Sequence, residues 1–260
     1  MKIKIEKIIE AAEIGSKVLK KYFGKKLEVV EKSSPADFKT VADEESEEKI
    51  LKILEKEFSD FSILTEEKGF RDKNSKYTFV IDPLDGTSNF VLGIPNFSVS
   101  IGLFKNNKGI AGVVVNPILK EVYFAQSGKG AFLNGRRIKV SRESDIKKAT
   151  IGYDCDYGYY LNKNLRRILE KLEEKKVKRF MVNMSPALEL CRVATGRMEG
   201  FINNANEIYD FAAGKLIVKE AGGIITNFKG EQEINERNNV FLAANNVNIN
   251  QELLEIMSVF

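Results

Sequence analysis

Apolar positions recur at helical intervals in the first part of the chain and at strand intervals after it. Residues 3–22 place Ile5, Ile8, Val18 and Leu19 near one face of a predicted helix, and a second helix is predicted over about 43–58. The polar stretch 32–37 between them indicates a loop. Short apolar runs divided by Asn, Gly and Pro turns then predict an antiparallel meander of strands at 61–64, 77–81, 97–104, 110–115, 121–126 and 131–133.

The rest of the chain alternates between the two patterns. Helices are predicted at 161–175, 185–195, 208–221 and 250–258, and strands at 178–182, 199–203, 223–227 and 239–244. Pro186 suits the first position of its helix, and Gly222 and Gly223 mark a helix end. Alternating helices and sheets of this kind pack in layers, so the pattern favours an α+β or an α/β fold.

The lack of histidine and the scarcity of cysteine limit the kinds of catalytic and metal site that the chain can form. The 260 residues include no histidine, and the two cysteines, Cys155 and Cys191, lie far apart. The lack of histidine excludes Ser-His-Asp and Cys-His catalysis and histidine-bound zinc, and the cysteine spacing disfavours a thiolate metal site. A bound metal would therefore need oxygen ligands, which favours Mg²⁺, Mn²⁺ or Ca²⁺.

Charge and hydropathy limit the kinds of partner that we expect. The net charge is +4, but lysines and glutamates are interleaved, so we expect no nucleic-acid partner. No apolar run reaches the roughly 20 residues that a membrane helix needs. The chain begins with an amphipathic pattern rather than a signal peptide. We therefore expect a cytoplasmic protein with reduced thiols and no membrane partner.

Acidic side chains stand at the ends of apolar segments, where burial is costly without a positive partner. They are Glu66 and Glu67 after one strand, Asp82 and Asp85 at the end of the next, and Asp210 at the start of a helix. Each has a structural alternative: a charged surface loop, a turn around Pro83, or a helix cap. Asp43, in the first turn of its helix, is open to the same interpretation as a cap.

Taken together, these carboxylates suit a hard divalent cation. Gly86 permits close backbone approach, and Thr87, Ser88 and Asn89 offer amides and hydroxyls at a predicted helix start, where phosphates bind. Metal carboxylates beside a phosphate cradle indicate metal-assisted phosphoryl transfer to water.

Two motifs then make the chain similar to the inositol monophosphatase family of Mg²⁺-dependent, lithium-sensitive phosphatases. "DPLDGTSNF" (82–90) resembles its signature D-P-[LI]-D-G-T-x-N-F at every fixed position. "YDFAAGKLIVKEAGG" (209–223) resembles its second signature, with Tyr209 in place of the usual tryptophan. "SSPADFKTVAD" (33–43), "TEE" (65–67), "GKGAFLNGRRIKVS" (128–141) and "FLAANN" (241–246) also fit, so the resemblance spans nearly the whole chain.

The resemblance implies an α+β fold, a layered αβαβα sandwich, and a homodimer. It implies one domain over 1–260, with a metal-binding α+β part at about 1–145 and a smaller α/β part at about 146–260. The implied cofactor is Mg²⁺, two to three ions, with Mn²⁺ as an alternative and inhibition by Li⁺. The implied metal ligands are Glu66, Asp82, the Leu84 carbonyl, Asp85 and Asp210.

The resemblance also implies the roles around the metals. Asp43 and Thr87 resemble the pair that orients and deprotonates an attacking water, with Glu67 nearby, and the predicted mechanism is direct in-line attack without a phosphoenzyme. The Gly86 and Thr87 amides would hold the phosphate. The implied substrate contacts are Asp85, Gly86, Thr87, Ser185, Asn203, Glu207 and Asp210.

Substrate and rival functions stay open. The implied substrates are inositol 1-phosphate and fructose 1,6-bisphosphate, as in prokaryotic enzymes of dual activity, with histidinol phosphate or 3'-phosphoadenosine nucleotides as alternatives. Asn203 stands where animal relatives have an acid that contacts an inositol hydroxyl, and Ser185 could instead be a helix cap. A haloacid-dehalogenase type phosphatase is disfavoured because two residues, not one, separate Asp82 from Asp85. A non-catalytic regulatory paralogue is disfavoured because every metal carboxylate is present.

Overall fold

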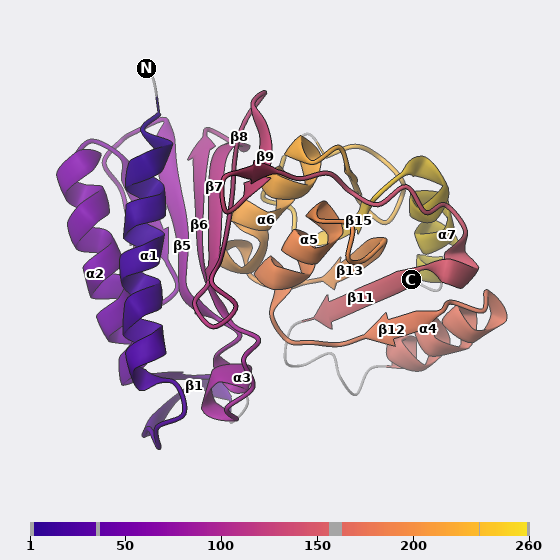
Figure 1. The fold of residues 1–260 in the computed structure, drawn as a ribbon, viewed down its shortest axis with the longest axis horizontal. Helices are drawn as coiled ribbons and strands as arrows, with labels where there is room; N and C mark the ends of the chain where they lie inside the picture. Colours follow the sequence, from indigo (N-terminus) through magenta and orange to yellow (C-terminus); the bar gives the residue numbers. More distant parts are fainter. Residues whose placement is uncertain (1–2, 35–36, 156–162, 234, 259–260) are drawn as a thin grey trace.

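A computed structural model describes residues 3–34, 37–155, 163–233 and 235–258. Figure 1 shows five layers in succession: a helix pair, a sheet, a second helix pair, a second sheet and a third helix pair. The predicted α+β sandwich with αβαβα layering is therefore confirmed. Among the helices of the described ranges, none is both long enough and apolar enough to cross a membrane.

The first helix pair covers one face of an eight-stranded sheet. Helices α1 (Ile5–Tyr22) and α2 (Val41–Glu57) bury their apolar stripes against it, including Ile8, Leu19 and Ile50. The sheet order is β10-β9-β8-β7-β6-β5-β3-β4. Its strands are β3 (Ser62–Thr65), β4 (Gly69–Arg71), β5 (Tyr77–Asp85), β6 (Ser98–Lys105), β7 (Lys108–Asn116), β8 (Glu121–Gln126), β9 (Gly130–Leu133) and β10 (Arg136–Arg137). The predicted antiparallel meander is confirmed for β5 to β9, whereas β3 pairs with β5 in parallel.

The segment predicted as a polar loop at 32–37 is instead part of a β-hairpin. Strand β1 (Val29–Ser34) pairs antiparallel with β2 (Asp37–Thr40), with Val29 opposite Thr40. Residues 35–36, between the two strands, lie outside the described residues. The prediction failed because a two-stranded hairpin outside the main sheets buries little of its surface. Its strands therefore carry polar residues that resemble a loop.

The second sheet has the order β12-β11-β13-β15-β14. Its strands are β11 (Thr150–Cys155), β12 (Arg179–Met181), β13 (Gly200–Asn204), β14 (Ile224–Thr226) and β15 (Val240–Ala244). Helices α5 (Pro186–Ala194) and α6 (Ile208–Glu220) separate the two sheets, and α4 (Lys163–Glu174) and α7 (Val247–Met257) cover the outer face. A one-turn 3-10 helix, Ile146–Lys148, leads into β11. Residues 161–162 of the predicted helix at 161–175 lie outside the described residues.

Strand β11 was not predicted, although it pairs in parallel with both β12 and β13. Its sequence, TIGYDC, places Gly152 and Asp154 inside a segment that is buried throughout. Glycine and aspartate are both depleted in strands, so the apolar signal is interrupted. The strand depends on pairing with distant partners, which local patterning does not reveal.

Helix α6 packs unusually close to the first sheet. At Gly112 of β7, a Cβ atom would lie 2.7 Å from the carbonyl oxygen of Ala213 on α6. Only glycine allows this contact, because a side chain there would push the helix away. The close packing places the first turn of α6 near the end of β5. The cysteines Cys155 and Cys191 are both buried, as expected of core thiols.

Candidate active site

Three aspartates from two distant parts of the chain converge between the sheets. Asp82 and Asp85 lie at the end of β5, and Asp210 lies in the first turn of α6. Each offers one carboxylate oxygen, and the three oxygens lie within 4.8 Å of one another. The backbone N–H of Leu84 donates to Asp82 Oδ1 at 2.8 Å, and the N–H of Glu207 donates to Asp210 Oδ2 at 2.8 Å. Local backbone contacts therefore fix one oxygen of each of these two carboxylates.

Two hydroxyl groups hold one carboxylate oxygen of Asp85 by hydrogen bonds. Its Oδ2 accepts hydrogen bonds from Ser98 at 2.8 Å and from Ser185 at 2.5 Å. Its Oδ1 is buried and has no hydrogen-bond partner. A buried carboxylate oxygen without a donor is costly, and a cation is the partner that would satisfy it. The register of β5 shifts between Asp82 and Asp85, so the strand end is irregular where the carboxylates emerge.

The electrostatics of the cluster favour a positive ligand. Burial, and then the charges of Glu66, Asp85 and Asp210, hold the pKa of Asp82 well above its usual range. Burial likewise raises the pKa of Asp210, with Glu66 and Asp85 adding to the effect. The pKa of Asp85 rises to about 7, chiefly through burial. Like charges packed in a low-dielectric site raise one another's pKa, and a divalent cation would reverse this shift.

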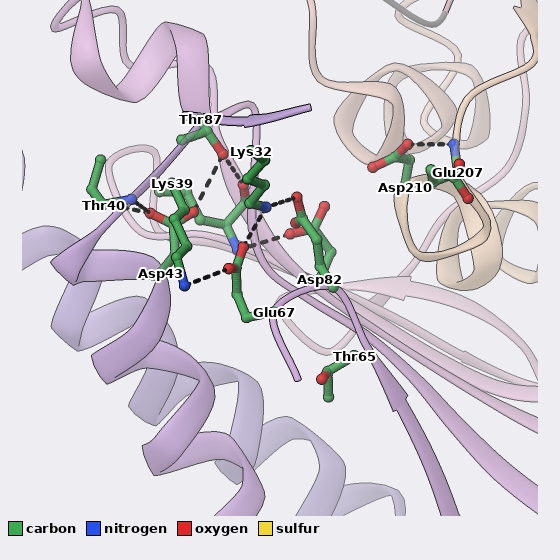
Figure 2. A network of polar contacts seen from close by, with 12 residues as sticks. Lys32, Lys39, Thr40, Asp43, Thr65, Glu67, Asp82, Thr87, Glu207 and Asp210 are labelled. Atoms are coloured by element: carbon green, nitrogen blue, oxygen red, sulfur yellow. Dashed lines mark hydrogen bonds and ion pairs between the residues drawn. The ribbon is translucent and has the colours of Figure 1, made fainter. Parts of the chain in front are cut away.

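The glutamate pair lies beside this cluster and is engaged by a lysine. The ammonium of Lys32, on β1, lies 2.7 Å from Glu66 Oε1 and 2.5 Å from Glu67 Oε1. Lys39 lies 3.6 Å from Glu67 Oε2. The negative charge of Glu66 is close enough to help raise the pKa of Asp82. Figure 2 shows Lys32 and Lys39 around Glu67, with Asp210 and Glu207 on the opposite side of Asp82.

A buried acid on α2 anchors the turn that carries the two glutamates. Glu47 is fully buried, and its Oε1 accepts the backbone N–H of Lys68 at 3.2 Å. Its Oε2 lies 3.2 Å from the Lys68 ammonium. The hydroxyl of Thr65 accepts the same N–H at 3.1 Å. These contacts place Glu66 and Glu67 at the edge of the site, and the sequence analysis did not identify Glu47.

Asp43 and Thr87 lie on facing elements. Thr87 Oγ1 lies 3.4 Å from Asp43 Oδ1 and 3.0 Å from the Leu84 carbonyl oxygen, and its single hydroxyl proton can be donated to either acceptor. Asp43 Oδ2 also accepts the N–H and hydroxyl of Thr40, at 2.8 and 2.6 Å, which forms a capping box at the start of α2. Burial raises the pKa of Asp43 to about 7. Asp43 therefore caps its helix with one oxygen and faces Thr87 with the other.

The chain turns sharply between β5 and the short helix α3 (Thr87–Val91). Gly86 has φ +85°, and a Cβ atom there would lie 2.9 Å from the Asn96 carbonyl. Only glycine fits this conformation and this contact. Asn89 donates through its amide to the carbonyls of Asn96 and Asn183, at 2.9 and 2.7 Å, and so ties this turn to the loop before α5.

A cavity of about 340 Å³ opens over these groups. Of the predicted site residues, it is lined by Glu66, Asp82, Leu84, Asp85, Gly86, Thr87, Glu207 and Asp210. The remaining lining residues are Asp37, Ser88, Asp154, Cys155, Met184, Pro186, Asn206 and Tyr209. Asp43 and Glu67 are not among the residues that line the cavity. Asp154 was missed because its strand was not predicted.

Ser185 and Asn203 do not line the cavity, contrary to their expected place on its wall. Both are fully buried. Ser185 precedes α5 without capping it, and its hydroxyl is committed to Asp85. The Asn203 amide nitrogen donates to the Asn239 carbonyl at 2.8 Å, and its oxygen accepts from Asn206 at 2.9 Å. Both side chains support groups that reach the cavity.

Comparison with known proteins shows which family of proteins this chain is similar to. The sequence profile described as "Inositol monophosphatase family" matches residues 4–258. A fructose-1,6-bisphosphatase/inositol-1-monophosphatase from Aquifex aeolicus is 36% identical over 233 residues, covering 85% of this chain and 86% of the relative. A protein from Pasteurella multocida named Nus factor SuhB is 38% identical over 200 residues, covering 76% of this chain and 74% of the relative.

Solved structures of similar proteins superpose well on this fold. The extragenic suppressor protein suhB from Bartonella henselae superposes with a TM-score of 0.90 at 33% identity, covering 98% of each chain. An inositol monophosphatase from Thermotoga maritima superposes with a TM-score of 0.88 at 32% identity, covering 96% of this chain and 95% of the other.

Proposed function

The chain belongs to the inositol monophosphatase family, and on that premise we propose that it is a Mg²⁺-dependent phosphatase of small polyol and sugar phosphates. The convergence of Asp82, Asp85 and Asp210 within 4.8 Å carries the proposal. The family match alone is insufficient, because several relatives, among them the Pasteurella multocida protein, bear the name of a Nus factor. The retained carboxylates favour an enzyme over a regulatory paralogue.

The residues of the site fit divalent cations with oxygen ligands. The side chains that would hold them are Glu66, Asp82, Asp85 and Asp210, together with the Leu84 carbonyl. The partnerless Asp85 Oδ1 and the raised pKa values of the three aspartates support this assignment. When bound, the ions supply neutralising charge for the phosphate ester and lower the pKa of a coordinated water.

Side chains and backbone N–H groups of the chain would orient the attacking water and the phosphate. Asp43 Oδ1 is placed to accept the proton of the Thr87 hydroxyl, which leaves Thr87 Oγ1 free to accept a proton from the attacking water. Backbone N–H groups at Gly86 and Thr87 would bind the phosphate oxygens. Glu67 forms ion pairs with Lys32 and Lys39 beside this pair. We propose direct in-line attack by water, without a covalent phosphoenzyme.

Inositol 1-phosphate and fructose 1,6-bisphosphate are the proposed substrates. The name of the Aquifex aeolicus relative supports both. The cavity volume, about 340 Å³, lies within the range of roughly 300–1,000 Å³ that is usual for small-molecule sites. Histidinol phosphate and 3'-phosphoadenosine nucleotides are the alternatives within the family.

We also propose a homodimer, supported by exposed apolar side chains at the end of α3 and just after it, and at the end of β12 and just after it. The exposed set is Val91, Leu92, Ile94, Met181 and Val182. The amide of Asn89 joins these segments by donating to the Asn183 carbonyl at 2.7 Å. Exposed large apolar side chains gathered on neighbouring segments are typical of a protein interface. Sedimentation equilibrium tests this point directly, with a dimer mass as the expected result.

Phosphate release tests the proposed activity. We expect Mg²⁺-dependent release from inositol 1-phosphate, fructose 1,6-bisphosphate or p-nitrophenyl phosphate, and its loss in EDTA. Asp82→Asn should lower kcat by about a thousandfold or more, because a central ligand loses its charge. Asp60→Asn, the same change at an exposed position, is the matched control and should keep full activity. Near-normal turnover by Asp82→Asn would refute the assignment, as would no release from any of these esters by the wild-type protein.

A further inference from the structure

Tyr209 carries a hydroxyl group at the cavity that the proposed reaction does not use. The residue lies in the first turn of α6, next to Asp210, and lines the cavity. Among the described residues, none forms a hydrogen bond with this hydroxyl group, and its oxygen is not fully buried. A tyrosine hydroxyl group in a partly buried position usually has a hydrogen-bond partner. We therefore expect the partner in the ligand that the cavity binds.

Packing against the first sheet holds the ring of Tyr209 in place. The side chain is partly buried against an apolar cluster that includes Val80 of β5. Val80 precedes Asp82 by two positions in the same strand, so both side chains lie on the same face of the sheet. The hydroxyl of Ser100, on the neighbouring strand β6, donates to the Tyr209 carbonyl at 3.2 Å. The ring is therefore anchored on the face of the sheet that carries Asp82.

The charges around Tyr209 place its hydroxyl group beside the acids that we assign to the metal site. Burial raises the pKa of Tyr209, and the rise is increased by the charges of Glu66, Asp210, Asp82 and Glu207. The first three of these carboxylates are proposed metal ligands. A tyrosine hydroxyl is protonated at neutral pH and is therefore available as a donor. Once cations occupy the carboxylates, an anionic oxygen bound to those cations is the acceptor that fits beside it.

Side-chain donors for a phosphate group are scarce in this cavity. None of the described residues that line it is a lysine or an arginine. The hydroxyl of Thr87 and the amide of Asn206 are both engaged within the chain. Of the described lining residues, Ser88 and Tyr209 carry hydroxyl groups that make no hydrogen bond to another described residue. Ser88 follows the turn that we propose to hold the phosphate, whereas Tyr209 would supply a donor from α6.

We propose that Tyr209 is a substrate-binding residue whose hydroxyl group donates a hydrogen bond to a phosphoryl oxygen of the bound ester. The inference rests on the proposed phosphatase function and adds a residue to its phosphate site. The signature that this segment resembles has tryptophan at this position, so the hydroxyl group is a feature of this chain. Inorganic phosphate, the product, would accept the same hydrogen bond.

Inorganic phosphate is the probe for the test because its binding requires no turnover. Isothermal titration calorimetry in Mg²⁺ compares the wild-type protein, Tyr209→Phe, which removes only the hydroxyl group, and Tyr77→Phe as the matched control. Tyr77 lies at the end of β5 away from Asp85, and its ring stacks on Phe61. We expect the Kd of phosphate to rise about tenfold in Tyr209→Phe and to stay unchanged in Tyr77→Phe. The affinity for Mn²⁺ without phosphate should be the same in all three proteins.

The outcomes separate this inference from the proposed function. An unchanged phosphate Kd in Tyr209→Phe, with normal Mg²⁺-dependent phosphate release by the wild-type protein, overturns only the role of Tyr209. A loss of Mn²⁺ affinity as large as the loss of phosphate affinity also overturns it, because the hydroxyl group would then act on the metal site. No Mg²⁺-dependent release by the wild-type protein overturns the phosphatase function, and the inference with it.

Tyr209→Trp provides a second readout, which also decides the case if Tyr209→Phe fails to fold. The chain contains no tryptophan, so the indole introduced by this substitution is the only one. Its fluorescence should change when phosphate is added to the Mg²⁺-loaded protein, because the phosphate would lie against this side chain. Fluorescence that responds to Mg²⁺ but not to phosphate would contradict a contact between position 209 and the phosphoryl group.

Discussion

The ammonium nitrogen of Lys32 lies 2.7 Å from Glu66 Oε1. It brings a positive charge from the β1–β2 hairpin to a carboxylate that we assign as a metal ligand. Mutual attraction and hydrogen bonding outweigh burial and hold the pKa of Lys32 above its usual range. Lys32 and a metal ion would therefore compete for the negative charge of the Glu66 carboxylate.

Lys32→Gln should strengthen activation by Mg²⁺ because it removes this competitor. We expect the Mg²⁺ concentration for half-maximal phosphate release to fall about threefold, equivalent to roughly 0.7 kcal/mol. Lys39→Gln is the control, since Lys39 approaches Glu67 at 3.6 Å but is not paired with Glu66. A higher Mg²⁺ requirement in Lys32→Gln would mean that the lysine assists the site rather than competing within it.

Without metal, the protein should lose stability as the pH rises. The pKa values of Asp43 and Asp85 are raised from 3.8 to about 7, so the folded state binds more protons than the unfolded state between these values. The free energy of unfolding therefore falls as the pH rises from about 4 to about 7. Urea unfolding in EDTA, repeated across this range, measures the slope, and saturating Mg²⁺ should reduce it. A slope that Mg²⁺ leaves unchanged would contradict metal binding by Asp85.

A buried ion pair anchors helix α6, which carries Asp210. Lys215 lies 2.8 Å from Glu233 Oε1 and 2.6 Å from the Asn238 carbonyl, and its side chain is 2% exposed. Lys215→Met leaves Glu233 as an unpaired buried charge, so we expect a loss of about 3–5 kcal/mol in the free energy of unfolding. Lys219→Met, on the same helix, removes a more exposed pair with Glu236 and should cost about 1 kcal/mol or less. Equal losses in urea unfolding would disprove the importance of burial here.

The convergence of the metal-type acids could be predicted from sequence because each acid interrupts an apolar segment. Asp82 lies near the end of a strand and Asp210 in the first turn of a helix, and both elements are apolar and buried over most of their length. The place of Asp43 was harder to fix, since a cap and a site residue have the same sequence signal. The structure shows that one carboxylate serves Thr40 and faces Thr87.

Two residues in or beside the cavity could not be placed from the sequence, for different physical reasons. Asp154 sits on a strand whose formation depends on β12 and β13, so its segment has no strong local pattern. Asn203 was placed on the wall by its distance from Asp210 along the chain, but that spacing does not reveal which hydrogen bonds its amide makes. Its amide is bonded to the Asn239 carbonyl and to Asn206, and it does not line the cavity.

Anomalous diffraction from crystals grown with Mn²⁺ and phosphate tests the account most directly, because it locates the ions without reference to activity. We expect Mn²⁺ peaks contacted by carboxylate oxygens of Asp82, Asp85 and Asp210, with phosphate beside Gly86 and Thr87. Mn²⁺ found away from these oxygens, or the three carboxylates turned from one another, would contradict the central claim.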